Sequence, residues 1–257
     1  MVLFSIFSTP PSSVWEWTIA FLQLIAAISL VSLLYLTFPV VRPKILPYPW
    51  PTNYSLHDKH KTVILAGSYN PPHLGHVQML NYLSSRYKHV VAVVGCNPSK
   101  TYSVSPQTRA IMLRRIMENE LSPCNNISVQ VVSEYVWRYG KSHNVSCFVR
   151  GIRTWKQDGE EERFLHILNT YGPLLVGPLV WPIPTVFLEG DPRYNHVSST
   201  LIRDVCSCSD DNAVISDANR NQDEATVTSS SLKRKEELIS QLVPASIASQ
   251  VIQIYSR

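Results

Sequence analysis

The sequence predicts an α/β protein: a Rossmann-like parallel sheet with helices on both faces, preceded by one N-terminal transmembrane helix. Short apolar runs of β type alternate with segments of helical period from residue 62 onward, which is typical of strand–helix–strand units. Residues 18–41 carry no charged side chain. A turn rich in glycine and proline, which also holds two histidines, follows the first predicted strand at residues 66–76. Ligands bind at that edge of a parallel sheet.

The apolar stretch at residues 18–41 exceeds the roughly 20 residues that a membrane helix needs. A cleaved signal peptide would start with a basic segment, but residues 1–17 carry only Glu16 as a charge. Arg42 and Lys44 follow the stretch, and this excess of positive charge predicts that the C-terminal side faces the cytosol. A buried core helix and an uncleaved targeting sequence are the alternatives. We predict a single-pass membrane protein with the domain that follows the helix on the cytosolic side.

Six segments follow from composition and periodicity. Residues 1–17 form a tail and residues 18–41 the membrane helix, and residues 42–60, with four prolines, are predicted to be a linker. The globular domain covers residues 61–206, residues 207–232 are polar and predicted to be disordered, and residues 233–257 return to helical period. Within the domain we predict strands at residues 62–65, 89–94, 127–132, 145–149 and 186–188, and helices at residues 77–87, 106–119 and 159–171.

Charge and cysteine content exclude some classes of protein. The net charge of +4 is mild and does not favour nucleic acid as a partner. The five cysteines are scattered and odd in number, which fits neither a disulfide framework nor a zinc site. We therefore expect reduced thiols and no dedicated metal site.

The stretch "AGSYNPPHLGH" (residues 66–76) carries the most specific chemistry in the chain. Gly67 directly after the strand lets the backbone approach a ligand closely. A helix that starts beside His76 points its amide groups and positive dipole end at the loop, which favours phosphate. His73 and His76 are three residues apart, so both imidazoles can face the same anion. Two structural histidines are the alternative reading.

These residues resemble the nucleotidylyltransferase superfamily, whose strand–loop–helix unit carries a [HT]-x-G-H signature. Three further stretches resemble phosphopantetheine adenylyltransferases: "NPSKTYSVSPQTRAIML", "FVRGIRTWKQDGEEERFLHILN" and "HVSSTLIRDV". They occur in the family's order, and "LVPASIASQVIQIY" resembles its closing helix. Tyr69 and Asn70 depart from the family's Phe-Asp, and His73 stands where bacterial members often have threonine. The resemblance implies the nucleotidylyltransferase fold.

The resemblance also implies roles for individual residues. His76 would stabilise the α-phosphate during transfer with help from His73, Lys100 would anchor the acceptor phosphate, and Arg153 would hold the departing phosphates. The acidic residues 160–162 fit a solvated helix start. The predicted catalytic residues are His76, His73, Lys100 and Arg153. The predicted nucleotide-binding residues are Gly67, Ser68, Tyr69, Gly75, His76, Gly151, Arg153, Ser198, Ser199 and Thr200, and the acceptor-binding residues are Ser68, Lys100 and Arg150.

The activity that the resemblance implies is adenylyl transfer from ATP to 4′-phosphopantetheine, which gives dephospho-CoA and pyrophosphate. Mg²⁺ would arrive with ATP, and the partners would be ATP, a phosphorylated small molecule and the membrane. A homo-oligomer is compatible with this prediction. The alternatives are the same fold acting on nicotinamide mononucleotide, a cytidylyl transfer onto an alcohol phosphate for lipid synthesis, and a non-catalytic membrane scaffold.

Overall fold

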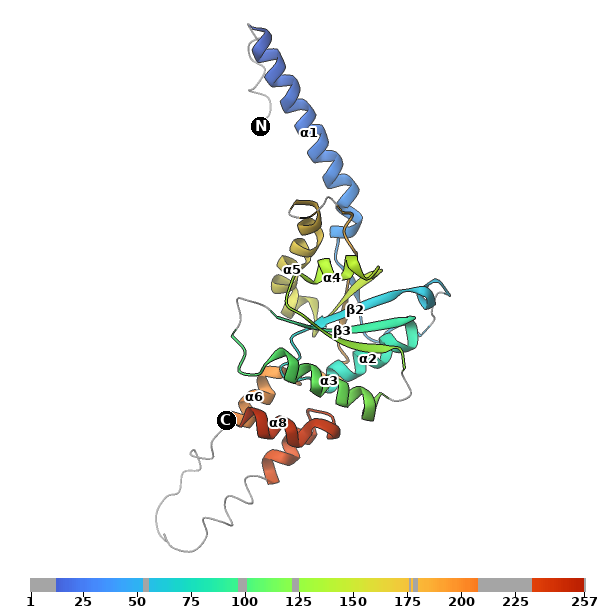
Figure 1. The fold of residues 1–257 in the computed structure, drawn as a ribbon, viewed down its shortest axis with the longest axis vertical. Helices are drawn as coiled ribbons and strands as arrows, with labels where there is room; N and C mark the ends of the chain where they lie inside the picture. The colour runs from blue at the N-terminus through green and yellow to red at the C-terminus, as the bar shows by residue number, and fades with distance from the viewer. Residues whose placement is uncertain are drawn as a thin grey trace, which may run out of the picture. The chain divides into compact units, whose positions relative to one another are not determined.

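A parallel sheet forms the centre of residues 43–257 in the computed structural model (Figure 1). The structure describes residues 13–52, 56–96, 101–121, 125–175, 177, 180–207 and 233–256. Within them the sheet has six strands in the order β1-β6-β5-β2-β3-β4, and every pairing is parallel. The strands are β1 (Lys44–Leu46), β2 (Thr62–Gly67), β3 (His89–Gly95), β4 (Ile127–Val132), β5 (Cys147–Ile152) and β6 (Thr185–Glu189). The predicted α/β fold is confirmed.

Helices connect the strands, as the right-handed crossovers of a parallel sheet require. The main differences from the sequence prediction are in three helices: α2 begins three residues before residue 77, α4 was not predicted, and α5 is longer than residues 159–171 at both ends. The α-helices are α1 (Val14–Val41), α2 (Leu74–Arg86), α3 (Pro106–Glu120), α4 (Val136–Ser142), α5 (Trp155–Leu175), α6 (Ser199–Ser207) and α8 (Ala248–Tyr255), and residues 233–240 are also helical. Short 3₁₀ helices are η1 (Leu56–His60), η2 (Pro192–Tyr194) and η4 (Ala245–Ile247).

The segment at residues 42–60, predicted to be a linker, contains a strand. β1 lies at the edge of the sheet, with Ile45 opposite Phe187 of β6. Trp50 follows, and its Nε1 donates a hydrogen bond to the carbonyl oxygen of Glu189 (2.8 Å). The linker prediction is therefore corrected for this part of the chain. A strand of three residues is too short to show the alternation of apolar and polar side chains by which strands are recognised.

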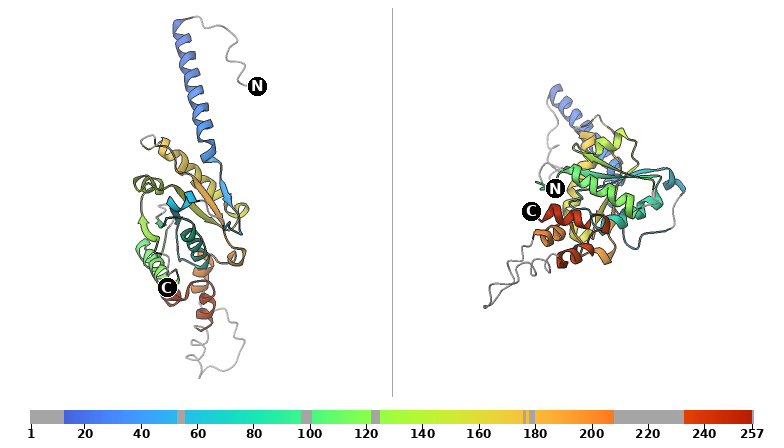
Figure 2. Two further views of the ribbon diagram at one scale, coloured as in Figure 1. Left: turned by 90° about the vertical axis from the view of Figure 1, so that its right-hand side faces the viewer. Right: turned by 60° about the horizontal axis from the view of Figure 1, so that its bottom comes forward.

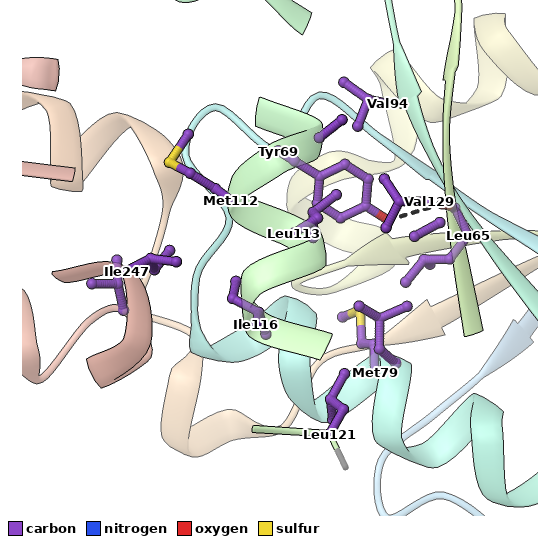
Figure 3. Packing of buried hydrophobic residues seen from close by; sticks show 14 of the residues in the cluster. Leu65, Tyr69, Met79, Val94, Met112, Leu113, Ile116, Leu121, Val129 and Ile247 are labelled. Carbon is purple, nitrogen blue, oxygen red and sulfur yellow. Dashed lines mark hydrogen bonds between the residues drawn. The ribbon is translucent and has the colours of Figure 1, made fainter. Parts of the chain in front are cut away.

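The sheet buries both of its faces. Val63 and Leu65 of β2 belong to a core cluster with Leu113 of α3, and Figure 3 shows Leu65 and Leu113 within this cluster. Ile64, between them in the sequence, points to the other face and joins a second cluster with Trp137 of α4. Successive side chains of a strand point to opposite faces, so a strand covered on both sides reads as a continuous apolar run. This is why residues 62–65 show no alternation.

The segment at residues 233–256 packs on the face that carries α2 and α3. Ile239, Ile247 and Val251 are fully buried in the larger cluster. Figure 2 shows α8, in red, beside α3, in green. Residues 208–232, which make up most of the predicted disordered insert, and residues 1–12 lie outside the described residues.

α1 belongs to a compact unit that is separate from residues 43–257. The Ser13 hydroxyl caps the helix by accepting a hydrogen bond from the backbone N–H of Glu16 (3.3 Å). Large apolar side chains, such as those of Phe21, Leu24 and Ile28, are exposed along it. Among the described residues it is the one helix whose length and composition would allow it to cross a membrane, from Val14 to Leu36.

Candidate active site

The order of the strands places a ligand site between β2 and β5. From β2 the chain adds β3 and then β4 on one side, after which it returns to add β5 and β6 on the other side. Ligands in such sheets bind at the carboxyl ends of the strands where the order reverses. β2 ends at Gly67, β5 at Ile152 and β6 at Glu189, so the loops that follow these residues meet at one edge.

A pocket of about 200 Å³ lies at this edge. It collects residues from the loop after β2, the end of β5, the loop after β6 and the start of α6. Seven of the residues predicted from the sequence line it: His73, Gly75, His76, Gly151, Arg153, Ser198 and Ser199. Segments more than 120 positions apart in the sequence therefore come together at this pocket.

His73 and His76 are joined across the first turn of α2. The backbone N–H of His73, the N-cap residue, donates a hydrogen bond to Nδ1 of His76 (3.2 Å). Nδ1 must therefore carry the lone pair, and the proton of the neutral imidazole lies on Nε2. The fold thus fixes one tautomer of His76, whose remaining ring nitrogen is a hydrogen-bond donor.

Both imidazoles are neutral at pH 7. Burial lowers the pKa of His73 to about 4. Burial also lowers the pKa of His76 well below its ordinary value, and the adjacent ring of His73 lowers it further. The two ring centroids are only 3.8 Å apart, so protonation of one ring opposes protonation of the other. Nδ1 of His73 is buried and has no hydrogen-bond partner among the described residues.

Two glycines let neighbouring groups approach the pocket. A Cβ atom on Gly151 would lie 2.4 Å from Sδ of Met79, so the end of β5 can touch α2 only without a side chain at this position. A Cβ atom on Gly75 would lie 3.2 Å from the ring of His73. These contacts explain both glycines by packing inside the protein.

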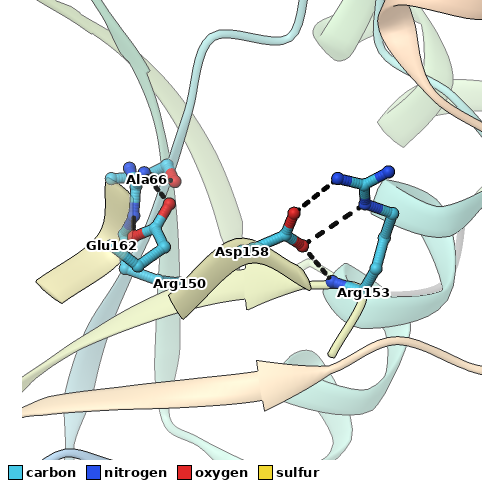
Figure 4. Close-up of polar contacts among 5 residues, drawn as sticks. All are labelled: Ala66, Arg150, Arg153, Asp158 and Glu162. Atoms are coloured by element: carbon cyan, nitrogen blue, oxygen red, sulfur yellow. Dashed lines mark hydrogen bonds and ion pairs between the residues drawn. The ribbon is translucent and has the colours of Figure 1, made fainter. Parts of the chain in front are cut away.

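Arg153 lines the pocket and forms an ion pair with Asp158, which the sequence did not indicate. Its Nη2 lies 2.5 Å from Oδ1 of Asp158, and its backbone N–H donates to Oδ2 of the same carboxylate (2.7 Å; Figure 4). The Arg153 side chain remains half exposed. An incoming phosphate would therefore compete with Asp158 for this guanidinium.

Arg150 does not line the pocket. It forms a bidentate ion pair with Glu162 of α5 (2.8 and 2.6 Å) and donates to the carbonyl oxygen of Ala66 (3.2 Å; Figure 4). Glu162 is only 8% exposed. The expectation that residues 160–162 are all solvated is thus corrected, because a buried carboxylate needs a paired cation and Arg150 supplies it. These contacts connect α5 to β5 and β2, the strands whose ends carry the site.

The serines at the start of α6 are already engaged. Ser198 accepts the backbone N–H of Leu201 (3.1 Å) as a helix cap, and Ser199 donates to the carbonyl oxygen of Pro71 (2.8 Å). Thr200 is exposed, and its hydroxyl accepts from Arg203 (3.1 Å). Ser198 and Ser199 line the pocket, whereas Thr200 does not.

The remaining predicted residues of the histidine loop lie outside the pocket. Tyr69 is fully buried, and its hydroxyl donates to the carbonyl oxygen of Leu65 (2.8 Å; Figure 3). The centroid of its ring lies 4.7 Å from that of the His76 ring. The Tyr69 side chain therefore supports His76, and the binding of the nucleotide by Tyr69 stays a prediction. Gly67 faces the Tyr69 ring, and the Ser68 side chain is exposed. Lys100 lies outside the described residues.

Several pocket residues were not predicted, and two of them are acidic. Asp191 is buried and accepts hydrogen bonds from Nη2 (2.6 Å) and Nε (3.0 Å) of Arg193, and hydrogen bonding to this guanidinium lowers the pKa of the carboxyl. Its position two residues after the end of an apolar strand was the available signal. Among the described residues no three His, Cys, Asp or Glu side chains are grouped so that they could hold a metal ion. The unpredicted residues are Met79, Ile152, Asp158, Gly190, Asp191, Tyr194, Asn195 and Val197.

A sequence match shows the family of this chain. Residues 64–205, more than half of the chain, match the sequence model of the cytidylyltransferase-like family, so the chain belongs to this family and is a nucleotidyltransferase. It is similar to the phosphopantetheine adenylyltransferase of Bifidobacterium longum, with 30% identity over 142 residues, which are 55% of this chain and 79% of that protein. The phosphopantetheine adenylyltransferase of Aquifex aeolicus is 30% identical over 156 residues, 60% of this chain and 89% of that protein.

Among solved structures, the chain is similar to a nicotinic acid mononucleotide adenylyltransferase of Plasmodium falciparum complexed with NaAD. The TM-score is 0.44 and the sequence identity 15%, over 76% of this chain and 94% of that chain.

Proposed function

We propose that this protein transfers the adenylyl group of ATP to 4′-phosphopantetheine, giving dephospho-CoA and pyrophosphate. A phosphate oxygen of the acceptor would bond to the α-phosphorus of ATP, while the bond from that phosphorus to the oxygen bridging to the β-phosphate breaks. Pyrophosphate then leaves with the electron pair of this bond. The reaction needs no covalent intermediate with the enzyme, so catalysis is a matter of positioning and of stabilising charge. The phosphopantetheine adenylyltransferases among the relatives support this choice of acceptor.

The observation that carries the proposal is the histidine pair. His76 is held by the backbone N–H of His73 in the tautomer that has its proton on Nε2, and it lines the pocket at the N-terminus of α2. A neutral donor fixed in this way stabilises the charge that develops on a phosphate oxygen in the transition state. His73, with an unpartnered Nδ1 among the described residues, would add a second contact.

The other phosphates of ATP would lie between β5 and α6. Arg153 would exchange Asp158 for a phosphate, because a guanidinium binds phosphate in the same bidentate manner as carboxylate. Ser198 and Ser199 line the same pocket at the N-terminal end of α6. Lys100 would anchor the acceptor phosphate. Mg²⁺ would be held by the phosphates of ATP, whose charge it neutralises, because Asp158 and Asp191 are already paired with arginines.

We further propose that α1 anchors the enzyme in a membrane. The apolar side chains exposed along α1 support insertion into lipid, where a helix satisfies its own backbone hydrogen bonds. Trp15 and Trp17 at the start of the helix suit a membrane interface. Arg42 and Lys44 directly after it favour the cytosol for residues 43–257.

The test is release of pyrophosphate by the full-length chain in detergent, with Mg²⁺ and ATP or CTP. The acceptors are 4′-phosphopantetheine, nicotinamide mononucleotide and choline phosphate, and the His76→Ala variant measures background. We expect release with ATP and 4′-phosphopantetheine. Release only with nicotinamide mononucleotide, or only with CTP and choline phosphate, would contradict the proposed acceptor. Activity no higher than that of His76→Ala with every pair would contradict catalysis itself and favour a scaffold.

A further inference from the structure

The loop that carries the histidines is strained and is held from outside. Tyr69 has a φ of 48°, in the left-handed region that a bulky residue adopts only when its surroundings enforce it. The Tyr69 ring packs against His76. Any shift of residues 69 and 70 would therefore move the imidazole of His76, which lines the pocket.

Two elements of the domain hold the backbone of this loop. Arg109 of α3, which is fully buried, donates from Nη1 to the carbonyl oxygen of Ser68. Arg203 of α6 donates from Nη1 to the carbonyl oxygen of Asn70 (2.6 Å). Together with the bond from Ser199 to the next carbonyl, these contacts tie successive residues of the loop to the helices around it.

The C-terminal segment adds two contacts on the side of the histidines. Leu74, the first residue of α2, donates its backbone N–H to the carbonyl oxygen of Leu242 (3.1 Å). The first N–H groups of a helix have no partner within the helix, so this bond satisfies one of them directly beside His73. Tyr255 of α8 donates its hydroxyl to Oδ1 of Asn70 (2.7 Å), across 185 positions of sequence.

The bond between Tyr255 and Asn70 is shielded from water. Both residues are only 6% exposed. Burial raises the pKa of Tyr255, so the hydroxyl stays protonated and remains a donor at neutral pH. A hydrogen bond at this depth is stronger than one exposed to solvent, and this bond fixes the residue that directly follows the strained Tyr69.

We propose that Tyr255 is a positioning residue: through Asn70 it holds the loop at residues 68–74 so that His76 is aligned with the reacting phosphate. This inference rests on the proposed function for its catalytic consequence, but the contact itself does not. Because misplacement of a catalytic group slows the chemical step more than it weakens binding, loss of the hydroxyl should lower kcat and spare KM.

The test compares Tyr255→Phe with Gln250→Ala in the full-length chain. Phenylalanine keeps the buried ring and removes only the hydroxyl. Gln250 lies on the same helix and accepts a hydrogen bond from Arg115 of α3 (3.1 Å), away from the loop, so its variant controls for general loosening of α8. We expect Tyr255→Phe to lower kcat roughly tenfold with KM for ATP within about twofold, and Gln250→Ala to change neither.

Hydrogen–deuterium exchange separates this inference from the identity of the acceptor. Peptides covering residues 66–78 should exchange faster in Tyr255→Phe, while those from residues 62–65 of β2 and from β3 keep their protection and Gln250→Ala matches the wild type. Unchanged exchange at residues 66–78 would overturn the proposal, whichever acceptor the enzyme uses. If the wild type transfers an adenylyl group to none of the acceptors, the proposed function is wrong. The exchange result still decides whether Tyr255 positions the loop.

A double-mutant cycle tests the route through Asn70. Asn70→Leu removes the acceptor, so the double variant with Tyr255→Phe should exchange residues 66–78 no faster than Asn70→Leu alone. If the increases in exchange rate of the two single variants multiply in the double variant, Tyr255 acts by another route and the proposal is overturned.

Discussion

Asp158 neutralises the guanidinium of Arg153 at the mouth of the pocket, with Oδ1 2.5 Å from Nη2. In the proposed reaction this arginine must leave the carboxylate before it can bind a phosphate of ATP. The pair therefore sets part of the cost of nucleotide binding.

Asp158→Asn should tighten ATP binding about three- to tenfold, because an amide accepts the backbone N–H of Arg153 but holds the guanidinium weakly. Titration calorimetry without acceptor measures the dissociation constant. Asp191→Asn is the matched control, since it removes a second pocket carboxylate whose partner, Arg193, does not line the pocket. Equal tightening in both variants would mean that negative charge in general, rather than the release of Arg153, opposes ATP.

His76→Ala should lower kcat about 10²–10³-fold with little change in the affinity for ATP, because the Nε2–H donor acts mainly in the transition state. His76→Asn is the control for the cap: its amide oxygen can still accept the backbone N–H of His73, but no group replaces Nε2. Steady-state kinetics and thermal unfolding should therefore show that both variants are slow and that only the alanine variant is less stable. An asparagine variant with wild-type kcat would contradict the role of Nε2.

Folding stability should fall as the pH drops from about 6.5 toward 4. A histidine whose pKa is about 4 in the folded state and near 6.5 in the unfolded state favours unfolding when it is protonated. His73 contributes on the order of 2 kcal/mol to the free energy of unfolding, with the partial exposure of this residue taken into account. This contribution is fully present above pH 6.5.

Urea unfolding at several pH values checks this prediction, with His73→Thr as the comparison. The variant lacks the titrating group, so its free energy of unfolding should decline less steeply over this range. Parallel curves for the two proteins would show that His73 does not cause the acid sensitivity.

Protease added to sealed vesicles with their cytosolic face outward should digest residues 43–257, if α1 spans the membrane in the proposed direction. Arg42 and Lys44 on the C-terminal side are the physical reason, because positive charge is retained in the cytosol. Vesicles opened with detergent provide the control for protease access. Protection of the domain in sealed vesicles would reverse the proposed orientation.

Much of the fold could be predicted from local pattern. The apolar run at residues 62–65, the glycine that ends it and the helical period after residue 76 follow from rules that act within a few residues. The same holds for α1, since an uncharged stretch of this length is informative by itself. β1 was not predicted, because a strand of three residues is too short to show an alternation of apolar and polar side chains.

The chain's own residues determined that a strand, a turn with His73 and His76, and a helix follow one another, because backbone propensity and side-chain period are local properties. Only the tertiary structure decided that Arg150 pairs with Glu162 instead of lining the pocket, and that Tyr255 reaches Asn70. Which charged or polar groups meet depends on where the sheet order brings distant segments together, and a buried group takes the partner that it finds there. A sequence motif specifies the groups that are present, whereas packing specifies which of them remain available to a substrate.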